Sequence, residues 1–183
     1  MQNISHIERF CGLAARGFVA AVVLCASQLF SAPQAEARGL VYAVKDNGDL
    51  MWHKHLGRDD GTFNWATDTG KLVGNGWAVK HVFSGGDGVI YTVMQNGDLL
   101  WHKHLGRDDG TFNWATDTGK RVGNGWAVKR VFSGGDGIIY TVMQNGDLLW
   151  HKHLGRNDGT FRWATDTGKR VGNGWNVPKV FGD

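Results

Sequence analysis

The chain contains three nearly identical copies of one segment, which recur at a period of 49 residues. The motif Trp-His-Lys-His-Leu-Gly begins at Trp52, Trp101 and Trp150. The other six tryptophans also fall at two fixed positions of the repeat, at Trp65, Trp77, Trp114, Trp126, Trp163 and Trp175. A period of about 40 to 50 residues with recurring aromatic and Gly positions is typical of repeat arrays such as β-propellers. We therefore expect the chain to act through several equivalent copies of one site.

One repeat predicts four short strands and no helix. Residues 88–94 are rich in β-branched and aromatic residues, which predicts a first strand, and residues 99–105 are predicted to form the second. The Asn96-Gly97 pair between them favours a hairpin, because both turn positions need a positive φ. After a long polar loop, a third strand follows Lys120 and a fourth covers residues 127–132. The prediction is an all-β fold, a β-propeller of three 49-residue four-stranded antiparallel blades.

The repeats define the predicted organisation of the chain. Residues 38–183 form the repeat region, and the three predicted blades cover residues 39–87, 88–136 and 137–183. The third repeat is two residues shorter than the others, because it lacks part of the Ser-Gly-Gly-Asp link.

Residues 1–37 have a different composition and are predicted to be a secretory signal peptide. Arg9 and Arg16 precede an apolar stretch at residues 17–30, and Ala35-Glu36-Ala37 offers a small-x-small cleavage site. The alternative is a membrane anchor, but the apolar stretch is shorter than the roughly 20 residues that a membrane span needs. We expect a chain without a membrane span after cleavage, located outside the cell or in the periplasm.

Cysteine content and charge narrow the classes of function. Cys11 and Cys25, the two cysteines of the chain, both lie in the predicted leader, so residues 38–183 carry neither a disulfide nor thiolate chemistry. The formal net charge is +3, and Lys and Arg form no cluster. The sequence therefore does not indicate nucleic acid as a partner.

Several motifs in order resemble the blades of tachylectin-2-like lectins. They are Asn64-Trp65-Ala, Val73-Gly-Asn-Gly-Trp77, Lys80-x-Val-Phe83 and the link Ser84-Gly-Gly-Asp-Gly-Val-Ile-Tyr91. The resemblance covers residues 38–183 and recurs in each repeat. It implies a lectin whose five-bladed propeller binds N-acetylated amino sugars (GlcNAc or GalNAc), with one site per blade between neighbouring blades.

The number of blades departs from that family. This chain has three repeats, whereas propellers usually need four to eight blades to close. An open arc of three blades would leave sheet faces and apolar side chains exposed. We therefore expect an incomplete ring that is closed by homo-oligomerisation. Two chains would supply six blades, and five chains would supply three five-bladed rings.

The resemblance also implies the residues of the carbohydrate site. The matching positions are Asn75, Trp77, Asp87, Asn124, Trp126, Asp136, Asn173 and Trp175. Trp offers a flat apolar face to sugar C–H groups, while Asn and Asp offer hydrogen bonds to hydroxyl and acetamido groups. The alternative is structural, with Trp77 packed between blades and Asp87 capping a Gly-rich turn.

Other polar clusters are interpreted as structural. His53 and His55, like their repeat equivalents, lie two apart on a strand and share one face, which is a possible metal-binding arrangement. No third ligand is evident, so we expect packing or a hydrogen bond to the neighbouring blade. Calcium binding by Asp59, Asp60 and Asp68 is a second alternative, but a solvated loop stiffened by Asp side chains is favoured. We expect Trp65 and its equivalents in the blade core, and no metal or cofactor.

Repetition favours a binding function. A weak sugar site becomes useful when several copies engage one surface together, so the prediction is a secreted multivalent lectin. The alternative is a non-enzymatic structural or protein-interaction propeller without a sugar site. An enzyme is not expected, because we find no paired carboxylates on facing strands and no Ser/His/Asp arrangement.

Overall fold

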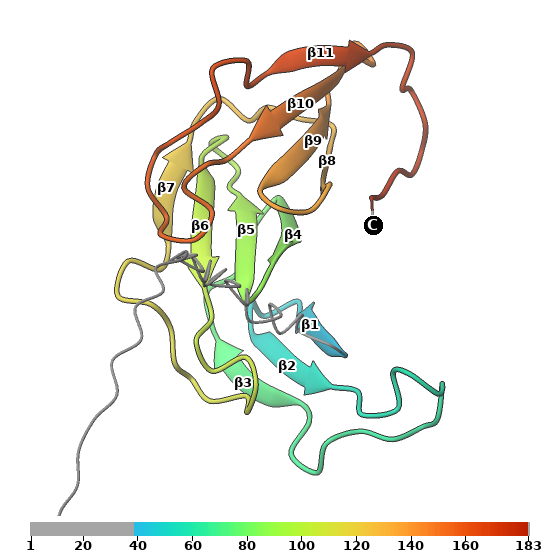
Figure 1. Ribbon diagram of the computed structural model, residues 1–183, viewed down its shortest axis with the longest axis vertical. Coiled ribbons are helices and arrows are strands. Elements are labelled where there is room, and N and C mark those ends of the chain that lie inside the picture. Colours follow the sequence, from blue (N-terminus) through green and yellow to red (C-terminus); the bar gives the residue numbers. More distant parts are fainter. Residues whose placement is uncertain (1–38, 183) are drawn as a thin grey trace, which may run out of the picture. The chain divides into compact units, whose positions relative to one another are not determined.

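The protein is described by a computed structural model, which covers residues 39–182. The predicted signal peptide, residues 1–37, lies outside the described residues. Eleven strands and no helix are present in residues 39–182, which confirms the all-β prediction (Figure 1). Within this range, therefore, no helix is long and apolar enough to cross a membrane.

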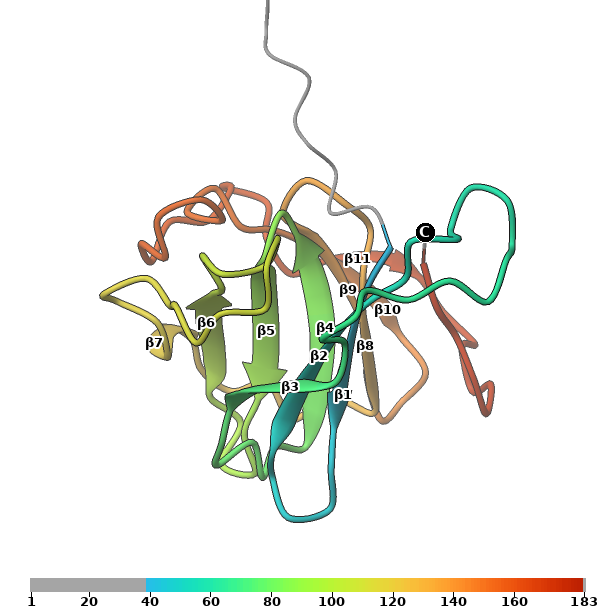
Figure 2. The same cartoon turned by 90° about the horizontal axis from the view of Figure 1, so that it is seen from below.

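The strands form three antiparallel sheets that follow one another along the chain (Figures 1 and 2). The first sheet contains β1 (Leu40–Val44), β2 (Leu50–Lys54) and β3 (Lys71–Gly74). The second contains β4 (His81–Gly86), β5 (Val89–Val93), β6 (Leu99–Lys103) and β7 (Lys120–Gly123). The third contains β8 (Arg130–Ser133), β9 (Ile138–Val142), β10 (Leu148–Lys152) and β11 (Lys169–Gly172). The sheets correspond to propeller blades, and residues 39–182 form an open arc of them and no closed ring.

Each four-stranded sheet takes its strands from two neighbouring repeats. Strand β4 comes from the end of the first repeat and pairs with β5 of the second, with Phe83 opposite Tyr91. Strand β8 ends the second repeat and pairs in the same way with β9, with Phe132 opposite Tyr140. The sheets are therefore offset from the 49-residue repeats by one strand. The first sheet has three strands because no described repeat precedes it.

The Asn-Gly pairs form the hairpins that the sequence predicts. Between β5 and β6, Gly97 has a φ of 84°, and its N–H donates to the carbonyl of Met94 over 3.0 Å. The Asn96 side chain accepts a hydrogen bond of 3.0 Å from the N–H of Asp98. The turn therefore combines a residue that tolerates positive φ with an Asn side chain that satisfies the backbone.

Tyr–His hydrogen bonds join successive sheets. The hydroxyl of Tyr42 lies 2.7 Å from Nδ1 of His104, and the hydroxyl of Tyr91 lies 2.8 Å from Nδ1 of His153. In each pair the Tyr lies on one sheet and the His on the next. The expectation that this second His of the motif bonds to a neighbouring blade is confirmed for His104 and His153.

Tryptophan side chains make a second set of contacts between sheets. The indole N–H of Trp52 donates to the carbonyl of Arg107, and that of Trp101 donates to the carbonyl of Arg156, each over 2.7 Å. A loop glycine of the following repeat covers the indole ring. A Cβ on Gly110 would lie 2.5 Å from Trp52, so only glycine fits there. The hydrophobic core accordingly extends from each sheet to the next.

Removing one Tyr–His bond should destabilise the fold measurably. Tyr91→Phe leaves Nδ1 of the buried His153 without its partner, which we expect to lower the free energy of unfolding by about 1–3 kcal/mol. Urea denaturation of Tyr91→Phe, His153→Phe and the double variant gives the coupling energy of the pair. Additive losses in this cycle would show that the bond does not join the two sheets energetically.

Candidate functional site

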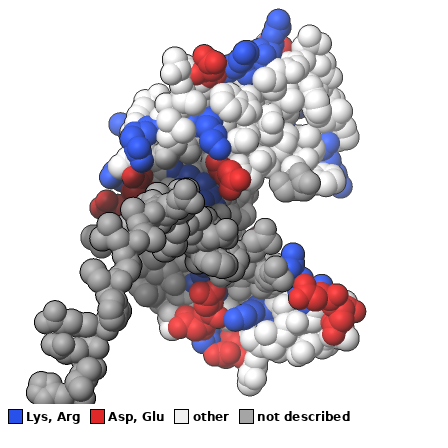
Figure 3. All heavy atoms as spheres, viewed as in Figure 1, with Lys and Arg blue, Asp and Glu red and all other residues white. Residues whose placement is uncertain are grey.

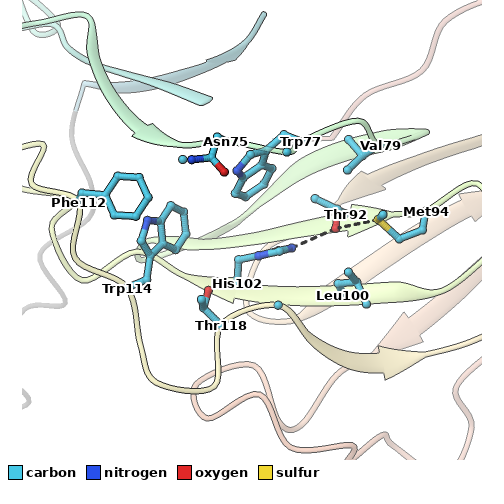
Figure 4. Close-up of a pocket in the computed structure, with 13 residues that line it drawn as sticks. Asn75, Trp77, Val79, Thr92, Met94, Leu100, His102, Phe112, Trp114 and Thr118 are labelled. Atoms are coloured by element: carbon cyan, nitrogen blue, oxygen red, sulfur yellow. Dashed lines mark hydrogen bonds between the residues drawn. The ribbon is translucent and has the colours of Figure 1, made fainter. Parts of the chain in front are cut away.

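A cavity of about 290 Å³ lies where the first sheet meets the second (Figure 4). One wall comes from the loop after β3, and the remainder comes from β5, β6 and the long loop after β6. Its lining residues are Gly74, Asn75, Gly76, Trp77, Val79, Thr92, Met94, Leu100, His102, Phe112, Trp114, Thr118 and Gly119. The cavity thus combines an aromatic surround with a few polar groups.

The Gly-Asn-Gly-Trp loop holds its indole against its own backbone. A Cβ on Gly74 would lie 2.5 Å from Nε1 of Trp77, so a side chain at this position would displace the ring. The N–H of Trp77 donates to the carbonyl of Gly48, in the hairpin turn of the same repeat, over 2.9 Å. Gly76 has a φ of 74°, which favours glycine. The hairpin and the two glycines therefore fix the position of Trp77.

Three rings meet in the cavity. The rings of Trp77 and His102 have centroids 4.6 Å apart, and the rings of Trp77 and Trp114 have centroids 5.8 Å apart. The indole N–H of Trp114 donates to the carbonyl of Val73 over 2.7 Å and so ties the second sheet to β3. Phe112 is more exposed and lines the cavity from the long loop (Figure 4). These rings offer apolar surface that packing between the sheets has already ordered.

The polar groups of the cavity are neutral near neutral pH. Nε2 of His102 lies 3.1 Å from the hydroxyl of Thr92, and burial lowers the pKa of His102 to about 4. Asn75 is exposed, and its amide makes no side-chain hydrogen bond to any residue in 39–182. The amide is therefore available to a ligand, next to an uncharged imidazole.

The same arrangement recurs between the second and third sheets. The centroids of Trp126 and His151 are 4.7 Å apart, and those of Trp126 and Trp163 are 5.8 Å apart. Nε2 of His151 lies 3.0 Å from the hydroxyl of Thr141, and burial lowers the pKa of this imidazole to about 4 as well. Asn124 is exposed beside Trp126, as Asn75 is beside Trp77. The chain therefore contains two equivalent sites between sheets.

The tachylectin family model matches residues 27–111 and 102–181, which together span most of the chain. The chain belongs to the tachylectin family. Comparison with curated proteins and with solved structures finds no match. Membership of this lectin family indicates a carbohydrate-binding function. The tachylectin repeats thus carry the aromatic and amide groups of the two sites.

The third Asn–Trp pair of the tachylectin repeats lies at the end of the last sheet. Asn173 and Trp175 follow β11, and both are exposed. No described sheet follows to supply the counterparts of His102 and Trp114. Within residues 39–182, this pair therefore forms one wall of a site.

The structure does not bring Asp87 and Asp136 to the Asn–Trp loops. Both aspartates line a second hollow of about 960 Å³ along the inner strands β4 and β8. Asp87 accepts hydrogen bonds from Arg156 over 2.8 Å and from Arg107 over 3.3 Å. The hydrogen bond from Arg156 is the main cause that lowers the pKa of this carboxyl. Asp87 therefore belongs to an ion-pair network that links the second and third sheets.

Two of the cavity residues are predicted from the sequence in other roles, and a third has no predicted role. The sequence predicts Trp114 in the blade core and His102 in packing or a hydrogen bond to the neighbouring blade, and both residues line the cavity as well. Phe112 lies in a long polar loop that the sequence analysis interprets through its Asp residues, so this side chain has no predicted role. An exposed aromatic residue recurring in each repeat, at Phe63, Phe112 and Phe161, is the signal that could have identified it.

The other candidate clusters make contacts within the protein. Among residues 39–182, no group of three or more His, Cys, Asp or Glu side chains could hold a metal ion. Asp60 accepts hydrogen bonds from the backbone N–H and the hydroxyl of Thr62 over 3.0 Å and 2.7 Å. An Asp side chain thus stiffens this exposed loop, as predicted.

The buried imidazoles predict how stability depends on pH. His102 and His151 keep a pKa of about 4 in the folded chain, whereas their ordinary value is 6.5. Only the unfolded chain takes up these protons between the two values. The contribution of these two imidazoles to the free energy of unfolding should therefore be complete above pH 6.5 and should decrease as the pH falls toward 4. Urea denaturation at a series of pH values measures this loss.

The double variant His102→Gln/His151→Gln is the matched comparison. It should be less stable than the parent at pH 7.5, because both Thr contacts change, but it should lose less stability between pH 6.5 and 4. Equal losses in the variant and the parent would mean that these two imidazoles are not the groups that titrate.

Proposed function

We propose that the protein is a secreted, multivalent lectin that binds N-acetylated amino sugars, GlcNAc or GalNAc, between adjacent blades. The observation that carries the proposal is the cavity between the first two sheets, where the unpaired Asn75 amide lies beside Trp77 and Trp114. The proposal describes a binding protein rather than an enzyme. The predicted signal peptide, residues 1–37, would direct it out of the cell.

The chemistry of the cavity suits a neutral sugar. Indole and phenyl faces from Trp77 and Phe112 can cover sugar C–H groups, and the Asn75 amide can both donate to and accept from an acetamido group. The volume of about 290 Å³ is at the small end of ligand pockets, which suits one monosaccharide unit rather than a long chain. The neutral His102 adds no charge that would favour an anion.

Two equivalent sites in one chain support the multivalent part of the proposal. The cavity between the first two sheets is small, so the affinity for a single sugar should be weak. Linked sites that engage one glycan surface raise the overall avidity by about 10²–10⁴ when the geometry allows simultaneous binding. Association of chains into a homo-oligomer would increase the number of sites further.

One observation favours the alternative, a structural propeller without a sugar site. Trp77 and Trp126 are buried to a similar degree by the sheets on both sides, so their packing alone could account for the motif. Replacing these tryptophans would therefore change folding and binding together. The exposed amides of Asn75 and Asn124 distinguish the lectin from the structural propeller, because they make no side-chain hydrogen bond within residues 39–182.

The variant Asn75→Ala/Asn124→Ala should retain the fold and lose sugar binding. Neither amide makes a side-chain hydrogen bond within residues 39–182, so we expect the urea midpoint to stay close to that of the parent. Loss of one or two hydrogen bonds to the sugar should weaken the affinity about tenfold or more. Calorimetric titration with an N-acetylglucosamine oligomer measures the change.

Asn113→Ala is the matched control for this experiment. Asn113 is also exposed, but it lies outside the cavity lining, so its removal should leave the affinity unchanged. Absence of saturable heat with the folded parent, for oligomers of both amino sugars, would contradict the proposed function and favour the structural alternative.

A further inference from the structure

The same dipeptide, Asn-Gly, occurs in two structural settings in residues 39–182. Three pairs form the hairpin turns, and three lie in the Gly-Asn-Gly-Trp loops: Asn47-Gly48, Asn96-Gly97 and Asn145-Gly146, then Asn75-Gly76, Asn124-Gly125 and Asn173-Gly174. Asparagine is chemically labile, most of all before glycine, which has no Cβ to shield its backbone nitrogen from the carboxamide. Any difference in reactivity between these pairs must therefore come mainly from the fold.

The hairpin pairs are hydrogen-bonded at both groups that would react. The carboxamide of Asn96 donates to the carboxylate of Asp98 over 3.0 Å, and its oxygen accepts from the N–H of Asp98 over 3.0 Å. The N–H of Gly97 donates over 3.0 Å to a carbonyl within the turn. The hairpins at Asn47 and Asn145 repeat these bonds over 2.8–3.1 Å. The carboxamide and the glycine nitrogen are thus both engaged.

The loop pairs lack these restraints. Asn75 is exposed, and among the described residues neither its carboxamide nor the N–H of Gly76 makes a hydrogen bond. Gly76 has a φ of 74°, and a Cβ on it would meet nothing within 4 Å. Gly125 and Gly174, with φ values of 70° and 74°, are equally open. Both reacting groups of each loop pair are therefore accessible to solvent.

We propose that Asn75, Asn124 and Asn173 are sites of spontaneous modification, at which the carboxamide converts to aspartate or isoaspartate with water as the co-reactant. In the first step, the backbone nitrogen of Gly76 attacks Cγ of Asn75. The new N–Cγ bond forms, and the Cγ–Nδ2 bond breaks with its electron pair on Nδ2. The proton of the glycine N–H leaves with this nitrogen as ammonia. The product is a five-membered succinimide.

Water then opens the succinimide at one of its two carbonyl carbons. Addition at Cγ breaks the new N–Cγ bond and gives aspartate. Addition at the main-chain carbonyl carbon of Asn75 breaks the original peptide bond and gives isoaspartate, whose main chain runs through Cβ and Cγ. In both cases the glycine nitrogen regains a proton and the carbon gains the hydroxyl. One water is consumed overall, one ammonia is released, and no oxidant or reductant is needed.

The conversion removes the amide that the candidate sugar sites use, and this consequence rests on the proposed function. A carboxamide both donates and accepts hydrogen bonds, whereas a carboxylate only accepts them. Isoaspartate also adds a methylene to the backbone between Gly74 and Trp77, whose close contact positions the indole ring beside Asn75 (Figure 4). The sites at Asn75 and Asn124 should therefore lose affinity as the protein ages.

Peptide mapping of the aged full chain tests the proposal. Trypsin places each Asn-Gly pair in a distinguishable peptide, at residues 46–54, 72–80, 81–103, 122–129, 131–152 and 171–179. In the native chain, the three loop pairs should convert about tenfold or more faster than the hairpin pairs, because a hairpin must open before it can react. Equal rates in loops and hairpins would overturn the proposal.

The unfolded chain is the internal control. In guanidinium chloride the hairpin bonds are lost, so all six pairs should convert at similar rates. A difference that persists in the denaturant would come from neighbouring side chains rather than from the fold, and would overturn the structural explanation. Loops that keep their amides in the native chain, while the unfolded chain converts, would show that the folded loop prevents ring closure and would overturn the proposal.

A charge measurement with matched variants tests the assignment. Each conversion adds one negative charge to a chain whose formal net charge is +3, so conversion at all three loops would bring it to 0. Lys and Arg are interspersed with Asp and Glu on the face that Figure 3 shows, so each added carboxylate is a large fraction of a small net charge. Ion-exchange chromatography should therefore resolve successive acidic forms during ageing.

The triple variant Asn75→Gln/Asn124→Gln/Asn173→Gln should form far less of these acidic species, because glutamine would have to close a six-membered ring. Asn113→Gln is the matched control, since Asn113 is exposed but precedes Trp114 rather than a glycine, and it should age like the parent. Acidic forms that appear in the triple variant at the parental rate would contradict the assignment.

Calorimetric titration with an N-acetylglucosamine oligomer separates this proposal from the proposed function. Loop conversion together with sugar binding that the aged chain loses supports both. Loop conversion in a chain that binds no sugar when fresh supports the modification and contradicts the function. Sugar binding by a chain whose loops keep their amides supports the function and overturns the modification. Conversion without any loss of affinity supports the modification and contradicts the role given to the amides.

Discussion

The fold depends on a strand that each blade takes from the preceding repeat. Because β4 and β8 come from the ends of the first and second repeats, the second and third sheets cannot be completed by their own repeats. Backbone groups at a strand edge need partners, and a four-stranded sheet obtains them here only across the repeat boundary. The Tyr–His and Trp–carbonyl bonds then fix the angle between sheets that are already connected. Within residues 39–182, this dependence on a neighbour leaves the first sheet with three strands.

The same joint that holds the sheets together forms the candidate site. Trp77 extends from one sheet, while His102 and Trp114 belong to the next, so the cavity exists only where two sheets meet. Packing orders the rings before any ligand arrives, which lowers the entropic cost of binding. The same packing restricts side-chain movement. The Trp77 ring, whose centroid lies 4.6 Å from that of His102, cannot move freely to fit a ligand. Specificity must then come from the exposed amides and from the loop aromatic residues.

The repeat period, the hairpins and the antiparallel strands could all be predicted from the sequence, because they are local. Asn96-Gly97 imposes its turn within four residues, and the β-branched and aromatic residues of 88–94 favour a strand that pairs with its hairpin neighbour. The partners of Asp87 could not be predicted in this way. Its carboxylate bonds to Arg156, 69 residues further along the chain, and no local pattern indicates a partner at that separation. The offset of one strand between each repeat and its sheet also depends on tertiary contacts. The strands have the same sequence pattern whether a sheet uses four strands of one repeat or takes one strand from the preceding repeat.

Differences between the repeats gather at the two ends of the arc. The first and second repeats differ at eight positions, and six of them lie in β1, β2 and their hairpin: Leu40/Val89, Val41/Ile90, Ala43/Thr92, Lys45/Met94, Asp46/Gln95 and Met51/Leu100. The third repeat differs from the second mainly in its final residues, at Asn176, Pro178, Lys179 and Gly182. Equivalent positions of the internal repeats occur in equivalent contacts between sheets. These contacts therefore restrain the sequence of both repeats together. Residues at the two ends of the described arc meet a different environment from their internal equivalents, so they are the positions at which repeats of one chain can become specialised.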